Sequence, residues 1–478
     1  MGTLKTITSI KLFFLFVLVL CYIFCNEGVS VLLLWTCCFM FYIISVASFS
    51  QRVQLVKGIR TFFRIDLLFY AFFYIIYLLP YQLYVFGVYD FELASSNIVK
   101  AYIEYTNISV ITSMIGFVSF SLGFDLFFKE EQELTEYKID KLYMGYISIF
   151  ILLLLLLSLA LFYFTGFSLL TLAEKYAGSS TGNSTFDSIY DLVTFWCLMG
   201  LGVCINHAMH FKLQAKHKLM LAIVMLWAFF VLVLGDRNVF FLLAIAALGG
   251  WFSFKRRLPF GYTIVFGLVA LITYKTIELT RSGNLNSVSS LITELGSSES
   301  SSSTFSTGSF DITTTTSRAT HSIISEPKDY AMGRYKLFAL ASGIPYSSNL
   351  FRKENETSST SLALSDDILG TLSSWKTGTN IISDSYFDFG IFGVIIILFF
   401  LGGFGANISN QATRLWANPL VLTRYLFTLA LFAELPRYGL GFALRQLIWL
   451  EVVYFFLRVS FDAYRTILEF NLGTKVIR

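Results

Sequence analysis

Long apolar segments recur along the chain and constrain its fold more than any other feature. Each is about 20 residues long, the length that an α-helix needs to cross the hydrocarbon core of a bilayer. The composition agrees, since 56% of the 478 residues are hydrophobic and only 14% are charged. Transmembrane β-strands would instead alternate apolar and polar residues over about 10 positions, and the sequence shows no such pattern. The chain is therefore predicted to be an all-α polytopic membrane protein.

Twelve segments meet this length criterion. Their approximate limits are 8–25, 29–49, 66–88, 104–127, 143–165, 188–206, 218–234, 238–254, 260–279, 389–407, 418–435 and 440–458. The first resembles the apolar core of a signal peptide, but it lacks a small-residue cleavage site and a second segment follows at once. We therefore expect an uncleaved anchor, with residues 1–478 forming a single membrane domain.

Lysine and arginine residues in the connections predict the orientation of the chain. They gather in alternate connections, for example at Arg64, Lys138, Lys216 and Lys255–Arg257. Because positive residues favour the cytoplasmic side, these connections and both termini are predicted to be cytoplasmic. The other connections then lie on the outer side of the membrane.

The longest outer connection, residues 280–388, joins the ninth and tenth segments. Residues 297–317 are rich in serine and threonine and offer little apolar surface, which predicts a mobile stretch. From Arg318 to Ser342 the composition favours a helix with one apolar face. We expect this large helical outer loop to be part of the membrane domain, with no separate soluble domain.

Arginine residues on the outer side oppose the usual charge rule. They are Arg237 after the seventh segment, Arg281 after the ninth, Arg318 and Arg334 in the outer helix, Arg437 after the eleventh, and Arg445 two turns into the twelfth. Guanidinium groups stay charged in a dry site and present a planar fork of donors to phosphate oxygens. Any one of them could pair with a neighbouring acid or contact lipid headgroups. Together they predict a site for an anion.

One segment resembles a known family. The run GTNIISDSYFDFGIFG, Gly378–Gly393, leads into the tenth apolar segment. It is similar to the Gly-Thr-Asn segment of the Wzy-type polymerases, which extend bacterial surface polysaccharides such as O-antigen and capsule. Other positions that resemble the family are the turn Gly235–Arg237, Arg281, Arg318 and Arg437. The resemblance covers roughly residues 225–455, and the Ser/Thr-rich stretch departs from it.

The resemblance implies a glycosyltransferase of the GT-C type in the bacterial plasma (inner) membrane, working on its outer face. Such an enzyme moves a growing glycan from one polyprenyl-pyrophosphate carrier onto the lipid-linked repeat unit on another. The departing pyrophosphate gains negative charge, which arginines placed beforehand stabilise without a metal ion or other cofactor. The implied partners are the lipid-linked glycans, the bilayer and a protein that regulates chain length, with no role for nucleic acid. The sugar and the type of polysaccharide stay open.

An acceptor hydroxyl must also lose a proton, so a general base is expected. The candidates are His321, Asp384, Glu278 and Glu434. His321 ranks first because it follows Arg318 by three residues, on the same helical face, and histidine has a suitable unperturbed pKa. Asp384 ranks second because it lies in the segment most similar to the family. Each of the three acids could instead be a structural salt-bridge partner.

Two alternatives remain open. An O-antigen ligase, which transfers finished glycan to the lipid A core, would share the topology and the outer arginines, and the Gly-Thr-Asn segment is the reason to prefer a polymerase. A flippase or other transporter for lipid-linked oligosaccharides would need charges along a central cavity. The interiors of the apolar segments are nearly free of charge, which favours chemistry at the outer surface.

Overall fold

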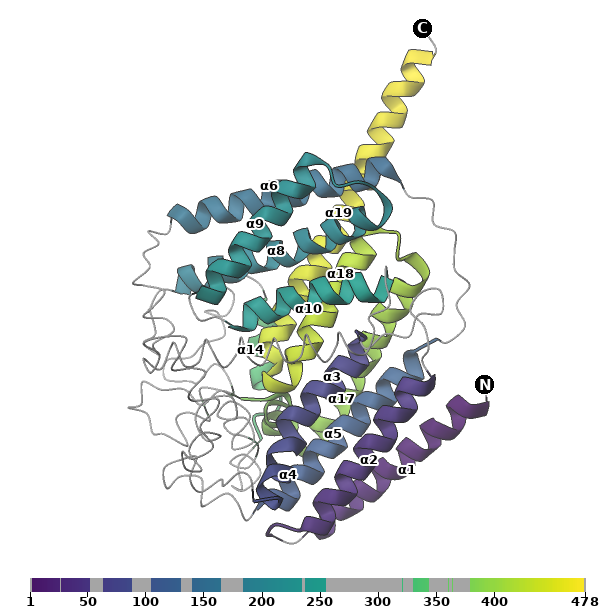
Figure 1. Ribbon diagram of the computed structural model, residues 1–478, viewed down its shortest axis with the longest axis vertical. Coiled ribbons are helices and arrows are strands. Elements are labelled where there is room, and N and C mark those ends of the chain that lie inside the picture. The colour runs from purple at the N-terminus through teal and green to yellow at the C-terminus, as the bar shows by residue number, and fades with distance from the viewer. Residues whose placement is uncertain are drawn as a thin grey trace, which may run out of the picture. The chain divides into compact units, whose positions relative to one another are not determined.

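The structure, a computed structural model, describes the main part of the chain. The described residues are 2–25, 27–51, 63–87, 105–129, 140–164, 184–233, 237–254, 320, 330–343, 360, 363 and 379–476. Every regular element among them is a helix, and none of them forms a strand (Figure 1). The prediction of an all-α protein is confirmed.

Within the described ranges, 9 helices are long and apolar enough to cross a membrane, which confirms a polytopic membrane protein. A shorter apolar helix covers Asn238–Phe254. Residues 260–279, which we predict to form the ninth span, lie outside the described residues. The total of twelve spans and the GT-C architecture therefore stay predictions.

The predicted limits agree with the structure where a segment is uniformly apolar. The span predicted at 104–127 is helix α5, Thr106–Phe127. The span predicted at 389–407 is part of a longer helix, α17, which covers Ile381–Leu415. That helix begins earlier than predicted because its polar first turns, including Ser383, are buried. A criterion based on apolar composition does not recognise such turns.

The chain forms two compact units, each built from several stretches of sequence. Unit 1 comprises Met1–Glu130, Arg256–Ser409 and Leu431–Ala443, and unit 2 comprises Glu131–Lys255, Asn410–Ala430 and Leu444–Arg478. The described helices of unit 1 are α1 (Gly2–Phe24), α2 (Val31–Gln51), α3 (Ile65–Phe73), the π-helix η1 (Tyr74–Leu78), α4 (Leu79–Val85), α5, α14 (Arg334–Ser342), most of α17 and the 3₁₀ turn η3 (Leu435–Arg437). Those of unit 2 are α6 (Lys141–Phe164), α8 (Ser184–His210), α9 (Ala215–Val233), α10 (Arg237–Phe254), most of α18 (Pro419–Glu434) and most of α19 (Leu440–Val476).

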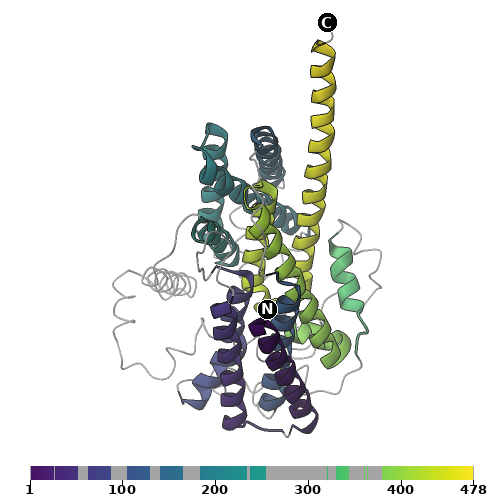
Figure 2. The same cartoon turned by 90° about the vertical axis from the view of Figure 1, so that its right-hand side faces the viewer.

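Helix α5 is the centre of unit 1, and nearly all of its residues are buried. Helices α1, α2 and α3 lie beside it (Figures 1 and 2). The ring of Phe120 stacks on that of Phe69 with centroids 3.8 Å apart. Two glycines let α5 and α17 approach closely, since a Cβ on Gly123 would overlap the carbonyl oxygen of Phe399, and a Cβ on Gly402 would overlap that of Phe120. Small residues allow backbones to meet in this way in membrane helices.

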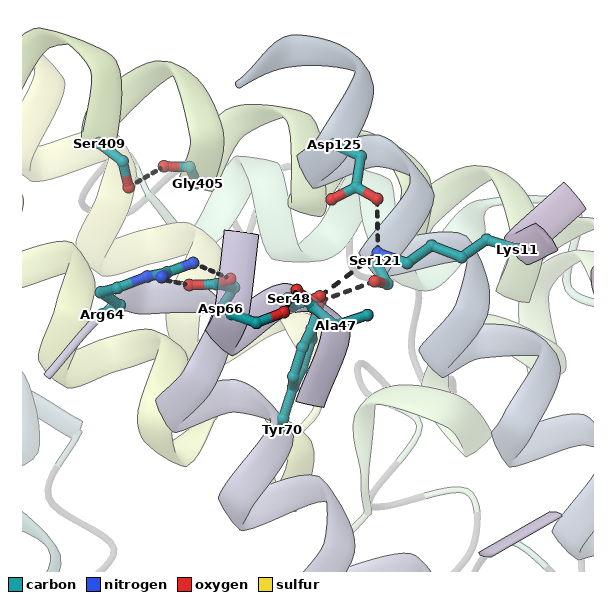
Figure 3. A network of polar contacts seen from close by, with 11 residues as sticks. Lys11, Ala47, Ser48, Arg64, Asp66, Tyr70, Ser121, Asp125, Gly405 and Ser409 are labelled. Carbon is teal, nitrogen blue, oxygen red and sulfur yellow. Dashed lines mark hydrogen bonds and ion pairs between the residues drawn. The ribbon is translucent and has the colours of Figure 1, made fainter. Parts of the chain in front are cut away.

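A buried ion pair joins α1 to α5. Lys11 Nζ lies 2.5 Å from Asp125 Oδ2, and both side chains are only 1% exposed (Figure 3). Lys11 also donates to Ser48 Oγ, which lies 3.5 Å from the hydroxyl of Tyr70. That hydroxyl in turn is 2.7 Å from Ser121 Oγ. This network is an exception to the nearly charge-free interior, and each of its two charges has an opposite partner, as burial of charge requires.

Three neighbouring helices pack together in unit 2, namely α6, α8 and α9 (Figure 1). The rings of His207 and His217 stack with centroids 3.7 Å apart, and Ser148 Oγ lies 2.9 Å from His217 Nε2. Elsewhere in the unit, Arg445 of α19 forms an ion pair with Asp191 of α8. Polar side chains inside unit 2 are therefore used to join one helix to the next.

Candidate functional site

The segment that resembles the polymerase family forms the kinked start of α17. Asn380 Oδ1 accepts the backbone N–H of Ser383 at 2.8 Å, so Asn380 caps the helix. Two turns later the helix breaks at Phe389 (φ −140°, ψ 16°) and Gly390 (φ 61°, ψ −148°). The second conformation is accessible to glycine and not to residues with a side chain. This requirement explains why the break falls at Gly390.

The break frees carbonyl groups of α17, and the segment before α14 satisfies two of them. Ala331 N–H donates to the carbonyl of Phe387 at 3.1 Å, and Met332 N–H donates to that of Asp388 at 2.9 Å. Buried backbone carbonyls need such partners. Backbone hydrogen bonds therefore dock the start of α14 onto the kink of α17.

Two carboxylates one turn apart on α17 share a cation from α14. Lys336 Nζ lies 2.8 Å from Asp384 Oδ2 and 2.9 Å from Asp388 Oδ2. The side chains of Lys336, Asp384 and Asp388 are 12%, 7% and 0% exposed, respectively. Each carboxylate also accepts an N–H from the first turn of another helix: Asp384 from Leu440 of α19 at 2.8 Å, and Asp388 from Tyr335 of α14 at 3.3 Å. A negative charge at a helix N-terminus is favourable, so both carboxylates act as helix caps.

Arg437 lies in a short turn between α18 and α19, Leu435–Gly439, which we call the Arg437 turn. The turn closes with a hydrogen bond from Tyr438 N–H to the carbonyl of Leu435 at 3.2 Å. The guanidinium carbon of Arg437 lies 5.2 Å from the centroid of the Tyr438 ring. The side chain of Arg437 is partly buried.

The Arg437 turn is anchored on both sides. Before Arg437, the hydroxyl of Tyr77 donates to the carbonyl of Pro436 at 2.8 Å. After it, the carboxylate of Asp384 accepts the N–H of Leu440. Gly439 packs against that carboxylate, because a Cβ there would lie 3.3 Å from Asp384 Cγ. The backbone on each side of Arg437 is thus held by a buried side chain from another helix.

Two isolated described residues from the long connection also contact the start of α17. Asn380 Nδ2 donates to Thr320 Oγ1 at 2.6 Å, and Ser383 Oγ donates to the same oxygen at 3.1 Å. Thr360 Oγ1 donates to Asp384 Oδ1 at 2.5 Å. Both oxygens of the Asp384 carboxylate therefore accept hydrogen bonds from the protein.

The structure describes four of the predicted site residues in unit 1. Asp384 and Glu434 are both buried. Arg334 begins α14, and its guanidinium carbon lies 5.7 Å from the centroid of the Phe338 ring. Arg437 occupies the turn that Asp384 anchors, so these two predicted residues are brought into one local structure.

Arg445 belongs to unit 2, where it forms an ion pair with Asp191. Its guanidinium carbon lies 5.7 Å from the centroid of the Trp449 ring. The remaining predicted residues are not described: Glu278, Arg281, Arg318 and His321 lie outside the described residues, as does the side chain of Arg237, the first residue of α10. Among the side chains that the structure describes, no group of three or more His, Cys, Asp or Glu could hold a metal ion. The roles of the undescribed residues stay predictions.

Sequence reasoning missed Lys336, Asp388 and Tyr77. A single lysine in a helix of mixed composition carries no signal of its own. Asp388 offers a weak signal, because acids four residues apart on a helix repel and so indicate a shared cation. Tyr77 lies three residues before Pro80, and a proline inside an apolar segment marks a disturbed helix. The structure confirms that disturbance as the π-helix Tyr74–Leu78.

The family of the chain is established by comparison with known proteins. A family model described as O-antigen polysaccharide polymerase Wzy matches residues 7–462, nearly the whole chain. No curated protein and no solved structure matches it. The match extends over both units and confirms the resemblance seen in Gly378–Gly393. The chain belongs to the O-antigen polysaccharide polymerase Wzy family, and it is a multi-pass membrane enzyme that polymerises O-antigen repeat units.

Proposed function

We propose that the enzyme joins polyprenyl-pyrophosphate-linked oligosaccharide units into surface polysaccharide on the outer face of the plasma membrane. The observation that carries this proposal is the family match over residues 7–462. Both termini then lie in the cytoplasm, and the connection at 280–388 lies outside. A chain-length regulator is the proposed protein partner.

Arginines are proposed to stabilise the leaving pyrophosphate in place of a metal ion. The proposed set is Arg237, Arg281, Arg318 and Arg437, with Arg334 as a helper. The anchored Arg437 turn supports this, since a cation held in place before reaction stabilises developing charge more than a mobile one. The ion pair of Arg445 with Asp191 favours a structural role for Arg445.

His321 is the proposed general base. Thr320, the residue bonded to it in the chain, hydrogen-bonds Asn380 and Ser383 in the family-like segment. Asp384 is a weaker candidate, because both of its carboxylate oxygens already accept hydrogen bonds from the protein. Glu278 and Glu434 are further candidates for the general base, to be tested beside Asp384.

The test uses purified full-length protein with polyprenyl-pyrophosphate-linked repeat units, and it looks for a ladder of products on a gel. Alanine at Arg237, Arg281, Arg318 or Arg437 should abolish the ladder while leaving the thermal unfolding midpoint unchanged. Arg414→Ala is the matched control, because Arg414 is exposed and lies in the last turn of α17, away from the kinked start of that helix. If all four variants make the ladder, the anion-site proposal is wrong.

Two further outcomes address the alternatives. A single transfer onto an added lipid A core acceptor, with no ladder, would identify a ligase. Movement of lipid-linked units across proteoliposomes, with no glycosidic bond formed, would identify a flippase. Either result would overturn the polymerase proposal.

A further inference from the structure

We infer that the hydroxyl of Tyr77 is a positioning group for polymerisation, because it holds the Arg437 turn in a single backbone arrangement. Tyr77 would not touch substrate, and it would act only through Arg437. The inference therefore rests on the proposed role of Arg437 and adds a residue from the N-terminal third of the chain to the site.

The contact is short and fully buried. Tyr77 Oη lies 2.8 Å from the carbonyl oxygen of Pro436, the residue directly before Arg437. The Tyr77 side chain is 2% exposed, and Pro436 is buried as well. One buried hydroxyl from η1 thus holds the carbonyl next to Arg437.

The other side of the turn is equally restrained. Leu440, three residues after Arg437, donates its N–H to Asp384, and Gly439 packs against the same carboxylate. A turn held at both ends leaves its central residue few backbone arrangements. The charge of Arg437 is then placed before the leaving group departs, which is the condition for strong electrostatic stabilisation.

The local helix around Tyr77 is unusual in a way that serves this contact. Leu79 N–H donates to the carbonyl of Tyr74, five residues earlier, so this turn is a π-turn. Pro80 follows, and its missing N–H prevents a regular turn at this point. Single π-turns inside α-helices occur often at functional sites, because they turn a side chain out of the regular helical register.

The experiment compares two conservative variants of the purified full-length enzyme. Tyr77→Phe removes the hydroxyl that anchors the Arg437 turn. Tyr70→Phe is the matched control, since Tyr70 lies two turns earlier, is also 2% exposed, and loses a hydrogen bond of 2.7 Å to Ser121. We expect Tyr77→Phe to lower kcat about tenfold with KM nearly unchanged, and Tyr70→Phe to change neither. Equal kinetic effects in the two variants would overturn the inference.

A double-mutant cycle then separates positioning from a general structural effect. In an Arg437→Lys background, Tyr77→Phe should lower kcat by less than about twofold, because the group being positioned has already changed. A loss as large as in the parent would show that Tyr77 does not act through Arg437, and would overturn the inference.

Hydrogen exchange adds a measurement that needs no activity. Backbone amides of the Arg437 turn should exchange faster in Tyr77→Phe than in the parent or in Tyr70→Phe. Unchanged exchange would refute the anchoring role. Failure of the proposed function gives a different result. In that case the parent enzyme makes no ladder, or Arg437→Lys remains fully active, whatever the hydrogen-exchange rates of the Arg437 turn.

Discussion

The ammonium group of Lys336 lies 2.8 Å from a carboxylate oxygen of Asp384, and it also donates to the backbone carbonyl of that residue at 2.7 Å. The same ammonium reaches Asp388, one turn further along α17. Because these carboxylates cap the starts of α19 and α14, one lysine pairs with two helix caps at once. The kinked start of α17 is thus the point at which three helices meet in unit 1.

Lys336→Met is expected to destabilise the protein by about 3–5 kcal/mol, because two buried carboxylates lose their cation. Thermal unfolding in detergent measures this loss. The exposed Lys218→Met is the control and should leave the unfolding midpoint unchanged. Adding Asp388→Asn to the Lys336 variant should recover part of the stability, since one uncompensated charge is removed. A Lys336→Met protein as stable as the parent would contradict the shared-cation interpretation.

Gly390→Ala is expected to cost about 1–3 kcal/mol, because the backbone at φ 61° and ψ −148° excludes a side chain. The added Cβ would also lie 2.7 Å from the Tyr330 ring. Gly441→Ala is the matched control, since Gly441 is helical and a Cβ there would meet its nearest neighbour at 3.4 Å. Truncating Tyr330 should relieve only part of the effect of Gly390→Ala, and complete recovery would mean that the backbone is not strained.

Gly402→Ala should destabilise unit 1 by about 1–3 kcal/mol, because the new methyl group meets the carbonyl oxygen of Phe120 and must push α5 and α17 apart. A backbone oxygen cannot turn aside as a side chain can. Gly145→Ala in unit 2 should be neutral or slightly stabilising, because the nearest atom to its Cβ is 3.9 Å away. Unfolding midpoints of the two variants compare these cases directly, and equal midpoints would show that the helices are not in close contact.

Lys11→Met is expected to lower stability by about 3–5 kcal/mol, because the buried carboxylate of Asp125 would lose the ammonium group that lies 2.5 Å from it. Asp125→Asn should have a similar effect, because the buried ammonium group of Lys11 would then lose the carboxylate that pairs with it. The double variant should lie close to the parent, since no charge is then left without a partner. Additive losses in the double variant would show that the two residues do not interact. Chemical denaturation of the three variants gives the coupling free energy.

Local properties of the chain are enough to predict helices whose segments are uniformly apolar. The span predicted at 104–127 lies within two residues of α5, because an uninterrupted apolar run has to lie in the membrane whatever its neighbours are. The family-like segment Gly378–Gly393 is also recognisable, since its Gly390 and its Asn380 cap are requirements of the backbone itself. Asp384 and Arg437 can therefore be selected as candidate site residues from the amino-acid sequence alone.

The contacts between those residues could not be predicted. Lys336, Tyr77 and Asp384 are far apart in the sequence, and nothing in local composition pairs a lysine with two acids on another helix, or a tyrosine hydroxyl with a distant proline carbonyl. Such pairs depend on which helices become neighbours, and packing of the whole unit decides this. Composition along the chain determines that the protein is helical and spans a membrane, and similarity to the family model over residues 7–462 assigns it to this family of enzymes. Only the tertiary structure decides that Asp384 caps α19, that Lys336 pairs with two carboxylates, and that Tyr77 holds the Arg437 turn. The physical reason is that a polar group buried in a shared core must bond to a partner that folding brings within reach.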